Sequence, residues 1–349
     1  KSWIKEYVDL PTNLTDQEIA DALVRVGFEV EEIILQGADL KGPLIVGKVL
    51  NIEELKEHKK PIRFVELDCG EGESRFVICG AQNFKAGDLI VASLPGAVLP
   101  GGFAISARET YGKTSNGMIC SARELGLGDD HSGIIVLPEG SANPGENAME
   151  LLEITETIFD IAVNPDRGYA LSIRGVAREI AAALKLEFND PAEFKFNLSG
   201  EGKAVEAKIA DGADVMYLRT LENFNPKAHS PIWMARRIEK CGMRPISLAV
   251  DVTNYVMLEL GQPLHAFDAE EIEGALEIRR AGSSRKLTTL DGVERTLNED
   301  DLVVADRKKV LALAGTMGGL ESEITEKTTR IAVEAVHFDP ISKIGRAHV

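Results

Sequence analysis

A succession of short, glycine-punctuated segments between about Leu40 and Leu151 constrains the fold of this chain more than any other feature. Each segment is a few apolar or alternating residues long, and glycine or proline stands at its ends: GPLIVGKVLNI, IRFVELDCG, SRFVICG, GDLIVASLPG, FAISARETYG and GIIVLP. Short strands joined by tight turns leave no room for crossover helices, so they pair with their neighbours and curl. The pattern therefore predicts a small closed β-barrel.

An OB-like barrel is the simplest candidate for this region. Its commonest use is to present a groove to single-stranded or looped nucleic acid, although a fold alone does not establish a function. Bases would stack on aromatic side chains. Those available are few, and we expect most of them to lie in the core: Phe64, Phe76, Phe84, Phe103 and Tyr111.

Helical segments flank the predicted barrel on both sides. Thr15 and Glu18 have the spacing of a capping box, and Gly27 is placed to end the helix that they begin. Ser172 can cap a second helix, in which apolar residues recur on one side as far as Leu184. Because the two segments are similar in character, the barrel is interpreted as an insertion that splits one small helical domain.

A third domain follows a polar connector. Ser230 and Pro231 form a cap and a first-turn proline for a helix that Gly242 closes. Strand-like runs beyond it predict a mixed α+β domain. The whole chain is thus predicted to be a multi-domain α+β protein with these parts: a split N-terminal domain (1–39 and 152–190), an OB-fold domain (40–151), the α+β domain (197–342) and a non-native tail (343–349).

Polar side chains gather in the stretch LAVDVTNYVMLELGQPLHAFD, Leu248 to Asp268. Its start has the composition of a short strand, and a helix ending at Gly261 follows. A strand feeding a helix would place Thr253 and Asn254 beside exposed backbone N–H groups at the positive end of the helix dipole. The alternative is a structural strand–helix–turn with a cap and a packed histidine.

Composition limits the classes of function. The chain has 349 residues, 44% hydrophobic and 27% charged, which predicts two or three globular domains. It has no apolar run of membrane-spanning length and no signal-peptide core, so we expect a cytoplasmic protein. Its four cysteines lack the spacing of a zinc site or a disulfide framework, and we expect them to be reduced and mostly buried.

A net charge of −17 argues against broad, non-specific binding of nucleic acid. A local basic face is still possible, and Arg236, Arg237 and Arg244 are weak candidates for RNA contact. Two further basic groups begin at Arg279 and Arg307. The competing interpretation of each group is an ordinary solvated surface.

Three residues are candidates for chemistry. Glu334 interrupts the apolar run IAVEAV, so it lies either on a solvent-facing edge strand or in a buried place with a purpose. Gly318 in GTMGG is either a turn residue or a residue whose missing Cβ lets a ligand approach the backbone closely. His265 is the histidine with other polar candidates beside it. No dinucleotide, Walker, nucleophile-elbow or zinc-protease motif is present.

With these residues established, the chain resembles the β subunits of bacterial phenylalanyl-tRNA synthetases. The resemblance rests on long motifs in the same order: VGKV (46–49), VICGAQN (77–83), GMICSARELGL (117–127), NPDRGYALSIRGVAREIA (164–181) and the run from Ser230 to Asp268. Two features depart from the family pattern. The barrel has a short EHKKPIRFVELDCG connection, and the chain stops at ISKIGRAHV, as a truncated N-terminal fragment would.

The resemblance implies a tRNA-binding OB-fold and an editing domain that hydrolyses tyrosine mischarged on tRNA(Phe). It implies catalytic roles for Thr253, Asn254 and His265. It implies substrate binding by Gly315, Phe267, Gly318 and Glu334, with Glu334 selecting the tyrosine hydroxyl. Aminoacylation with ATP and magnesium would belong to an α subunit in an α2β2 assembly, leaving no cofactor or metal in this part. The alternative is a non-enzymatic RNA-binding or subunit-assembly module.

Overall fold

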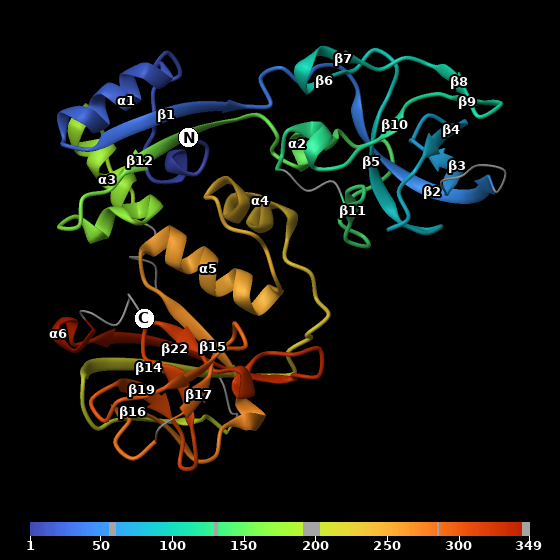
Figure 1. Cartoon of the computed structure of the whole chain (residues 1–349). Helices are drawn as coiled ribbons and strands as arrows, with labels where there is room; N and C mark the ends of the chain where they lie inside the picture. The colour runs from blue at the N-terminus through green and yellow to red at the C-terminus, as the bar shows by residue number, and fades with distance from the viewer. Residues whose placement is uncertain (56–60, 129–131, 191–202, 285, 344–349) are drawn as a thin grey trace. The chain divides into compact units, whose positions relative to one another are not determined.

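The computed structural model describes residues 1–55, 61–128, 132–190, 203–284 and 286–343 (Figure 1). They form two compact units. The first unit comprises Lys1–Val163, Ala182–Leu186 and Pro231–Arg236, and the second comprises Asn164–Ala181, Glu187–Ser230 and Arg237–Val349. Residues 344–349 of the predicted tail and most of the polar connector lie outside the described residues. Within the described part, no helix is both long enough and apolar enough to cross a membrane.

The first unit begins with the predicted capping box. The Glu18 backbone N–H donates to the Thr15 hydroxyl while the Glu18 carboxylate accepts from the Thr15 N–H, which confirms this start for α1 (Asp16–Arg25). Strand β1 (Glu29–Gln36) pairs antiparallel with β12 (Glu156–Ala162), so the chain returns here after the barrel. The three-domain boundaries stay a prediction.

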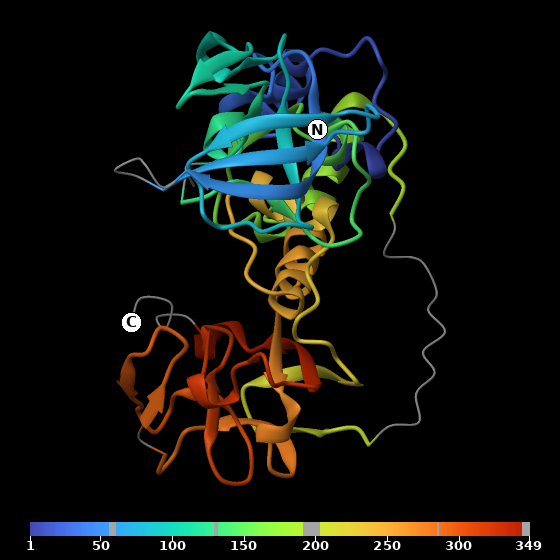
Figure 2. The ribbon, with the colours of Figure 1, turned by 90° about the vertical axis from the view of Figure 1, so that its right-hand side faces the viewer.

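Between β1 and β12 the chain forms the curled sheet β10-β5-β2-β3-β4, with β11 also paired to β5 (Figure 2). Its end strands β10 and β4 are not paired among the described residues, but Asn116, two residues before β10, donates its backbone N–H to Phe76 O of β4 at 2.7 Å. The barrel is thus partly closed. The bounds are β2 (Leu44–Leu55), β3 (Ile62–Asp68), β4 (Ser74–Cys79), β5 (Leu89–Ser93), β10 (Met118–Ile119) and β11 (Val136–Leu137).

Shorter elements complete the first unit. Two small hairpins are formed by β6 (Val98–Leu99) with β7 (Phe103–Ala104) and by β8 (Arg108–Thr110) with β9 (Lys113–Ser115). The short helices are η1 (Ile4–Glu6), η2 (Pro100–Gly102), η3 (Arg123–Leu125) and α2 (Ala148–Leu151).

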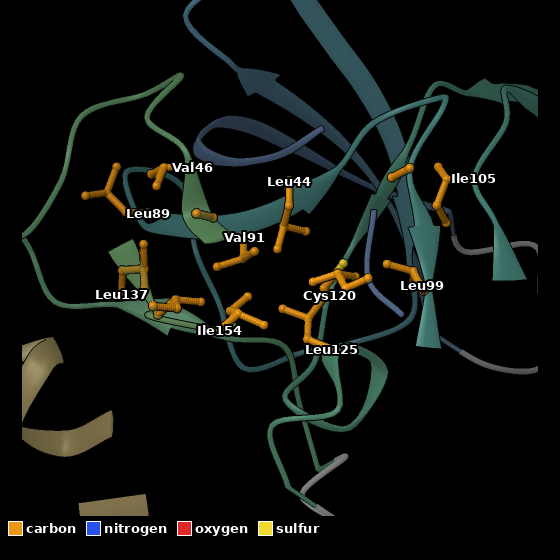
Figure 3. Packing of buried hydrophobic residues seen from close by; sticks show 14 residues of the cluster. Leu44, Val46, Leu89, Val91, Leu99, Ile105, Cys120, Leu125, Leu137 and Ile154 are labelled. Atoms are coloured by element: carbon orange, nitrogen blue, oxygen red, sulfur yellow. The ribbon is translucent and has the colours of Figure 1, made fainter. Parts of the chain in front are cut away.

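Apolar side chains fill the barrel, as Figure 3 shows for the cluster around Leu44, Val91 and Cys120. Cys69, Cys79 and Cys120 are buried and free, as predicted, and Cys241 is half-buried. The expectation for the aromatic residues is wrong for most of them. Of the five, Phe84 is buried and Phe64 half-buried, whereas the other three are exposed: Phe76, Phe103 and Tyr111.

The second unit contains two sheets. A three-stranded sheet has the order β14-β22-β15, and a five-stranded sheet has the order β13-β16-β19-β20-β21. Phe267 of the first sheet packs with Leu276, Val304 and Leu311 of the second, so a shared core lies between them. The strands are β13 (Glu206–Ile209), β14 (Ala213–Glu222), β15 (Leu264–Asp268), β16 (Ala275–Arg280), β19 (Leu302–Ala305), β20 (Val310–Leu313), β21 (Met317–Gly318) and β22 (Arg330–Phe338), with the hairpin β17 (Lys286–Thr288) and β18 (Glu294–Thr296). This confirms a mixed α+β fold.

The principal helices are α3 (Ile173–Leu184), α4 (Ile232–Lys240) and α5 (Leu248–Leu260). Ser172 caps α3 through a 3.1 Å hydrogen bond from Gly175 N, and Gly261 ends α5 in the left-handed region, both as predicted. Short helices η4 (Gly168–Ala170), η6 (Ala269–Glu271), η7 (Leu320–Ser322) and α6 (Pro340–Lys343) complete the unit.

The predicted strand at the start of the Leu248–Asp268 stretch is wrong, because α5 is helical from Leu248 onward. The buried Asp251 carboxylate reaches back to accept from Ile246 N at 2.7 Å and also accepts from the Ser230 hydroxyl. These bonds hold the incoming chain. Asp251 N already bonds to Ser247 O at 2.8 Å, so the helical ladder begins there and overrides the local strand preference.

Candidate functional site

Glu334 lies in β22, the central strand of the three-stranded sheet, with β14 on one side and β15 on the other. The edge-strand interpretation is therefore wrong. Its side chain is buried, and its Oε2 has no hydrogen-bond partner among the described residues. Burial without a counter-charge raises the pKa of this carboxyl to about 8. A group in that state is ready to bond to a polar atom brought by a ligand.

His265 stands directly opposite Glu334 in the β15–β22 register. Residues opposite one another on neighbouring strands point to the same face, so the imidazole and the carboxyl share one small space. The His265 ring meets the Phe267 ring edge-on, with centroids 4.4 Å apart. Burial lowers the pKa of His265 to about 4, so the imidazole is neutral at pH 7.

Gly318 in β21 completes this space, because its missing side chain admits the imidazole. A Cβ atom at Gly318 would lie 2.5 Å from His265 Cε1 and 2.7 Å from Nε2, well inside van der Waals contact. No positive φ demands glycine at this position. At Gly318 the group that approaches the backbone is thus the His265 ring, and the approach of a ligand to this residue stays a prediction.

Thr253 and Asn254 do not lie at a helix N-terminus, which corrects the sequence interpretation. Both belong to the interior of α5, where backbone N–H groups are already used in the helix. The Thr253 hydroxyl donates to Val250 O at 2.7 Å, and its side chain is buried. Asn254 is half-buried. Helix α5 packs against β15 (Figure 1), which places these residues near the strand of His265 without showing a contact to it.

The remaining predicted substrate-binding residues have different surroundings. Phe267 is fully buried in the core between the two sheets, where its ring supports His265. Gly315 is exposed at the tip of the β20–β21 hairpin with φ +58°, so the turn accounts for glycine at this position.

Two apolar neighbours of the site were missed. Leu218 lies opposite Glu334 on the β14 side. Leu290 donates its N–H to Gly318 O at 3.0 Å, and its Cδ1 would lie 3.1 Å from a Cβ at Gly318. Neither leucine carries a sequence signal, because only strand order brings it to the site. Leu218 thus borders Glu334, whereas Leu290 borders Gly318 and is itself partly exposed.

The three arginines predicted to contact RNA do not form one exposed group. Arg236 is buried and donates through Nε to Leu152 O at 3.0 Å, so the prediction is wrong for this residue. Arg237 is half-buried and donates to the Tyr255 hydroxyl at 2.9 Å. Arg244 is exposed and stays a candidate.

Possible metal ligands were sought separately from the Glu334–His265 pair. Among the residues that the structure describes, no group of three or more His, Cys, Asp or Glu side chains is arranged to hold a metal ion.

Two family descriptions match this chain. Residues 44–147 match "Putative tRNA binding domain", which covers the curled sheet, and residues 212–349 match "B3/4 domain", which covers the two sheets of the second unit except β13. His265, Gly318 and Glu334 all fall within the second match.

Curated relatives match nearly the whole chain. A phenylalanine–tRNA ligase β subunit of Thermobifida fusca is 55% identical over 99% of this chain, and one of Streptomyces avermitilis is 54% identical over 99%. The chain spans 43% of the length of each of these relatives. Among solved structures, an N-terminal fragment of the phenylalanyl-tRNA synthetase β subunit of Pyrococcus horikoshii is 15% identical, covering 53% of this chain and 56% of that one. Its TM-score is 0.31, too low to carry an argument.

Proposed function

The chain belongs to the family of phenylalanine–tRNA ligase β subunits, and from this premise we propose that its second unit hydrolyses tyrosine wrongly esterified to tRNA(Phe). The observation that carries the proposal is the pairing of Glu334 with His265. One is a buried carboxyl with an unpartnered oxygen, the other a neutral imidazole, and they face the same space. A selector and a group that can hold water are the two parts such a site needs.

Glu334 distinguishes tyrosine from phenylalanine. A pocket shaped for phenylalanine can only partly reject one extra hydroxyl, so correction requires a second site that recognises this hydroxyl. With its pKa raised to about 8, the Glu334 carboxyl is mostly protonated in the empty site at pH 7. It can then donate to the phenolic oxygen and accept from the phenolic O–H. Phenylalanine offers neither bond and would leave the buried carboxyl unsatisfied.

His265 positions the attacking water. Its neutral imidazole can accept a hydrogen bond from water at pH 7, although a pKa near 4 makes it a weak general base. The water oxygen bonds to the ester carbon, the bond from that carbon to the ribose oxygen breaks, and the released ribose oxygen takes up the proton. Thr253 and Asn254 are proposed to bind near the ester from α5. No covalent nucleophile is required.

The complete enzyme would divide its chemistry between subunits. We place tRNA(Phe) binding and editing in this chain, and aminoacylation in an α subunit that uses ATP and magnesium within an α2β2 assembly. This division predicts that the purified chain shows no phenylalanine-dependent exchange of pyrophosphate into ATP. Exchange by this polypeptide alone would refute the division.

The decisive test measures deacylation of Tyr-tRNA(Phe) and of Phe-tRNA(Phe) by the assembled enzyme, with wild-type chain and with Glu334→Ala. We expect wild type to prefer Tyr-tRNA(Phe) and the variant to lose this preference. A preference that survives Glu334→Ala would remove the selector and with it the proposed editing site.

The second candidate function is a non-enzymatic RNA-binding or subunit-assembly module. The match of residues 44–147 to a tRNA-binding description favours an RNA-binding role for the first unit. It does not explain the buried carboxyl in the second unit whose oxygen has no partner among the described residues. A purely structural domain would be more stable with an apolar residue in its place. An assembled enzyme that binds tRNA but never deacylates Tyr-tRNA(Phe) would favour this candidate.

A further inference from the structure

Two phenylalanine rings lie stacked on the outer face of the curled sheet. Phe64 of β3 and Phe76 of β4 have ring centroids 5.2 Å apart and an interplanar angle of 17°. Phe76 is the outer member, with 40% of its surface exposed, while Phe64 is half-buried. The inner face of the same strands holds the apolar core residues Val65 and Val77. The stack is therefore additional to the core.

Cations lie over the half-buried Phe64 ring and over the exposed Phe103 ring of this unit. Lys113 Nζ is 4.7 Å from the Phe64 centroid and is held by a 3.0 Å ion pair with Glu53. Arg108 Cζ is 5.2 Å from the centroid of Phe103, a ring that is 47% exposed. Proteins that bind single-stranded nucleic acid combine these two features, because bases stack on rings while cations meet the phosphates.

A hollow of about 860 Å³ adjoins the stack. Ile78, which pairs with Phe64 in the β3–β4 register, lines one side of it, and Phe103 and Arg123 line others. Glu124 also lines the hollow, but its Oε2 already accepts from the backbone N–H and hydroxyl of Ser121. The Phe64–Phe76 stack, Lys113 and the hollow thus lie beside one another along β4, within the first unit.

We propose that Phe64, Phe76, Lys113 and this hollow form one binding track for single-stranded RNA. One base stacks on Phe76, the neighbouring phosphate meets Lys113, and an adjacent nucleotide enters the hollow between Phe103 and Arg123. The inference rests on the proposed RNA-binding role of the first unit and identifies the surface that performs it. The cations over the ring faces favour RNA over an apolar peptide, which would need neither Lys113 nor Arg108.

The nearby carboxylates limit the affinity. Glu53 forms the ion pair with Lys113, and Glu66 accepts from the Ser74 hydroxyl at 2.8 Å on the same strands. Few net positive charges therefore face the phosphates, so stacking supplies a large share of the binding. Affinity should consequently respond more to loss of a ring than to loss of a charge.

The test is fluorescence anisotropy of the 349-residue chain with a labelled single-stranded RNA of roughly 12 nucleotides. Phe76→Ala and Phe103→Ala should each raise Kd by about 5- to 100-fold, as loss of a base–aromatic stack does. Phe76→Trp should preserve affinity, and Lys113→Gln should raise Kd less and reduce its dependence on salt. Tyr217→Ala is the control, because it removes an exposed ring from β14 of the second unit.

Phe76→Leu keeps the apolar volume and removes the ring, so it should also weaken binding while preserving the thermal midpoint. The proposal is overturned if Phe76→Leu binds like wild type, or if duplex RNA of the same length binds as tightly as the single strand. It also fails if a leucine-rich peptide occupies the hollow and the RNA does not. These outcomes are independent of editing, because loss of the track leaves the Tyr-to-Phe deacylation ratio at Glu334 unchanged.

Discussion

The Glu334–His265 pair and the Phe64–Phe76 stack break the usual distribution of side chains in opposite ways. The pair places ionisable groups in a mainly apolar interior, where the Glu334 oxygen has no partner among the described residues. The stack places large apolar rings on the outside of a sheet that already has a filled core. Both arrangements cost stability in the empty protein. A ligand would offset this loss of stability in each region, by bringing a hydroxyl to Glu334 and a base to the Phe64–Phe76 stack.

Removing the Phe267 ring should have the largest effect on stability in either region. Phe267 is fully buried beside His265, so Phe267→Ala should lower the free energy of unfolding by about 3–5 kcal/mol. Chemical denaturation monitored by circular dichroism measures this change. A loss below about 1 kcal/mol, typical of an exposed site, would show that the ring lines an open pocket.

Adding one methyl group at Gly318 should displace His265, because the new Cβ would lie 2.5 Å from the ring. Misplacing a group that orients the reactants by about 1 Å can cost about 100-fold in rate. We expect that loss in Tyr-tRNA(Phe) deacylation for Gly318→Ala. Gly168→Ala is the matched control, since a Cβ there meets no atom within 4 Å. If both variants deacylate Tyr-tRNA(Phe) at the same rate, the position of His265 does not matter for the reaction.

Substituting Glu334 should change selectivity more than fold. Glu334→Ala removes two hydrogen bonds between a neutral carboxyl and the tyrosine hydroxyl, each worth about 0.5–1.5 kcal/mol, so the Tyr-to-Phe ratio of kcat/KM should fall about 5- to 150-fold. Stability should be unchanged or slightly higher, because an unsatisfied buried group is removed. An unfolded variant would instead indicate that Glu334 has a structural role.

The pH dependence of stability tests the burial of Glu334 without substrate. The ordinary pKa of this carboxyl is 4.5, and burial raises it to about 8 in the folded protein. Between these two pH values the folded protein keeps a proton that the unfolded chain releases, so the free energy of unfolding falls as the pH rises. His265 acts oppositely, but only between pH 4 and 6.5. Between pH 6.5 and pH 8, the free energy of unfolding of the wild type should fall by about 2 kcal/mol relative to that of Glu334→Gln. Parallel curves for the two proteins would contradict the raised pKa.

The exposed stack should give the smallest effect on folding. Because 40% of Phe76 is exposed and the core behind it is complete without it, Phe76→Ala should change the free energy of unfolding by no more than about 1 kcal/mol. Thermal unfolding measures this, beside Phe267→Ala as the buried counterpart. A loss as large as that of Phe267→Ala would make Phe76 a core residue and weaken its assignment to RNA.

The sequence by itself determined the local features of this protein. Thr15 with Glu18 starts α1, Ser172 caps α3, and Gly261 ends α5, because caps and left-handed glycines act over a few residues. Short alternating runs with turns between them predicted a small closed β-barrel, which the structure shows as a partly closed, curled sheet, and the later runs predicted a mixed α+β domain. These signals need no knowledge of distant partners.

Only the tertiary structure decided where the functional side chains lie. The run around Glu334 fits an edge strand or a central one, and β22 is central because β14 and β15 both pair with it from distant parts of the chain. Contact between Gly318 and His265 depends likewise on strand order. Alternation could not tell which face of β4 is covered, so most of the aromatic residues in this region were expected in the core although Phe76 is exposed. Long-range packing also made Leu248 the start of a helix, since local propensity is weaker than the tertiary bonds of Asp251.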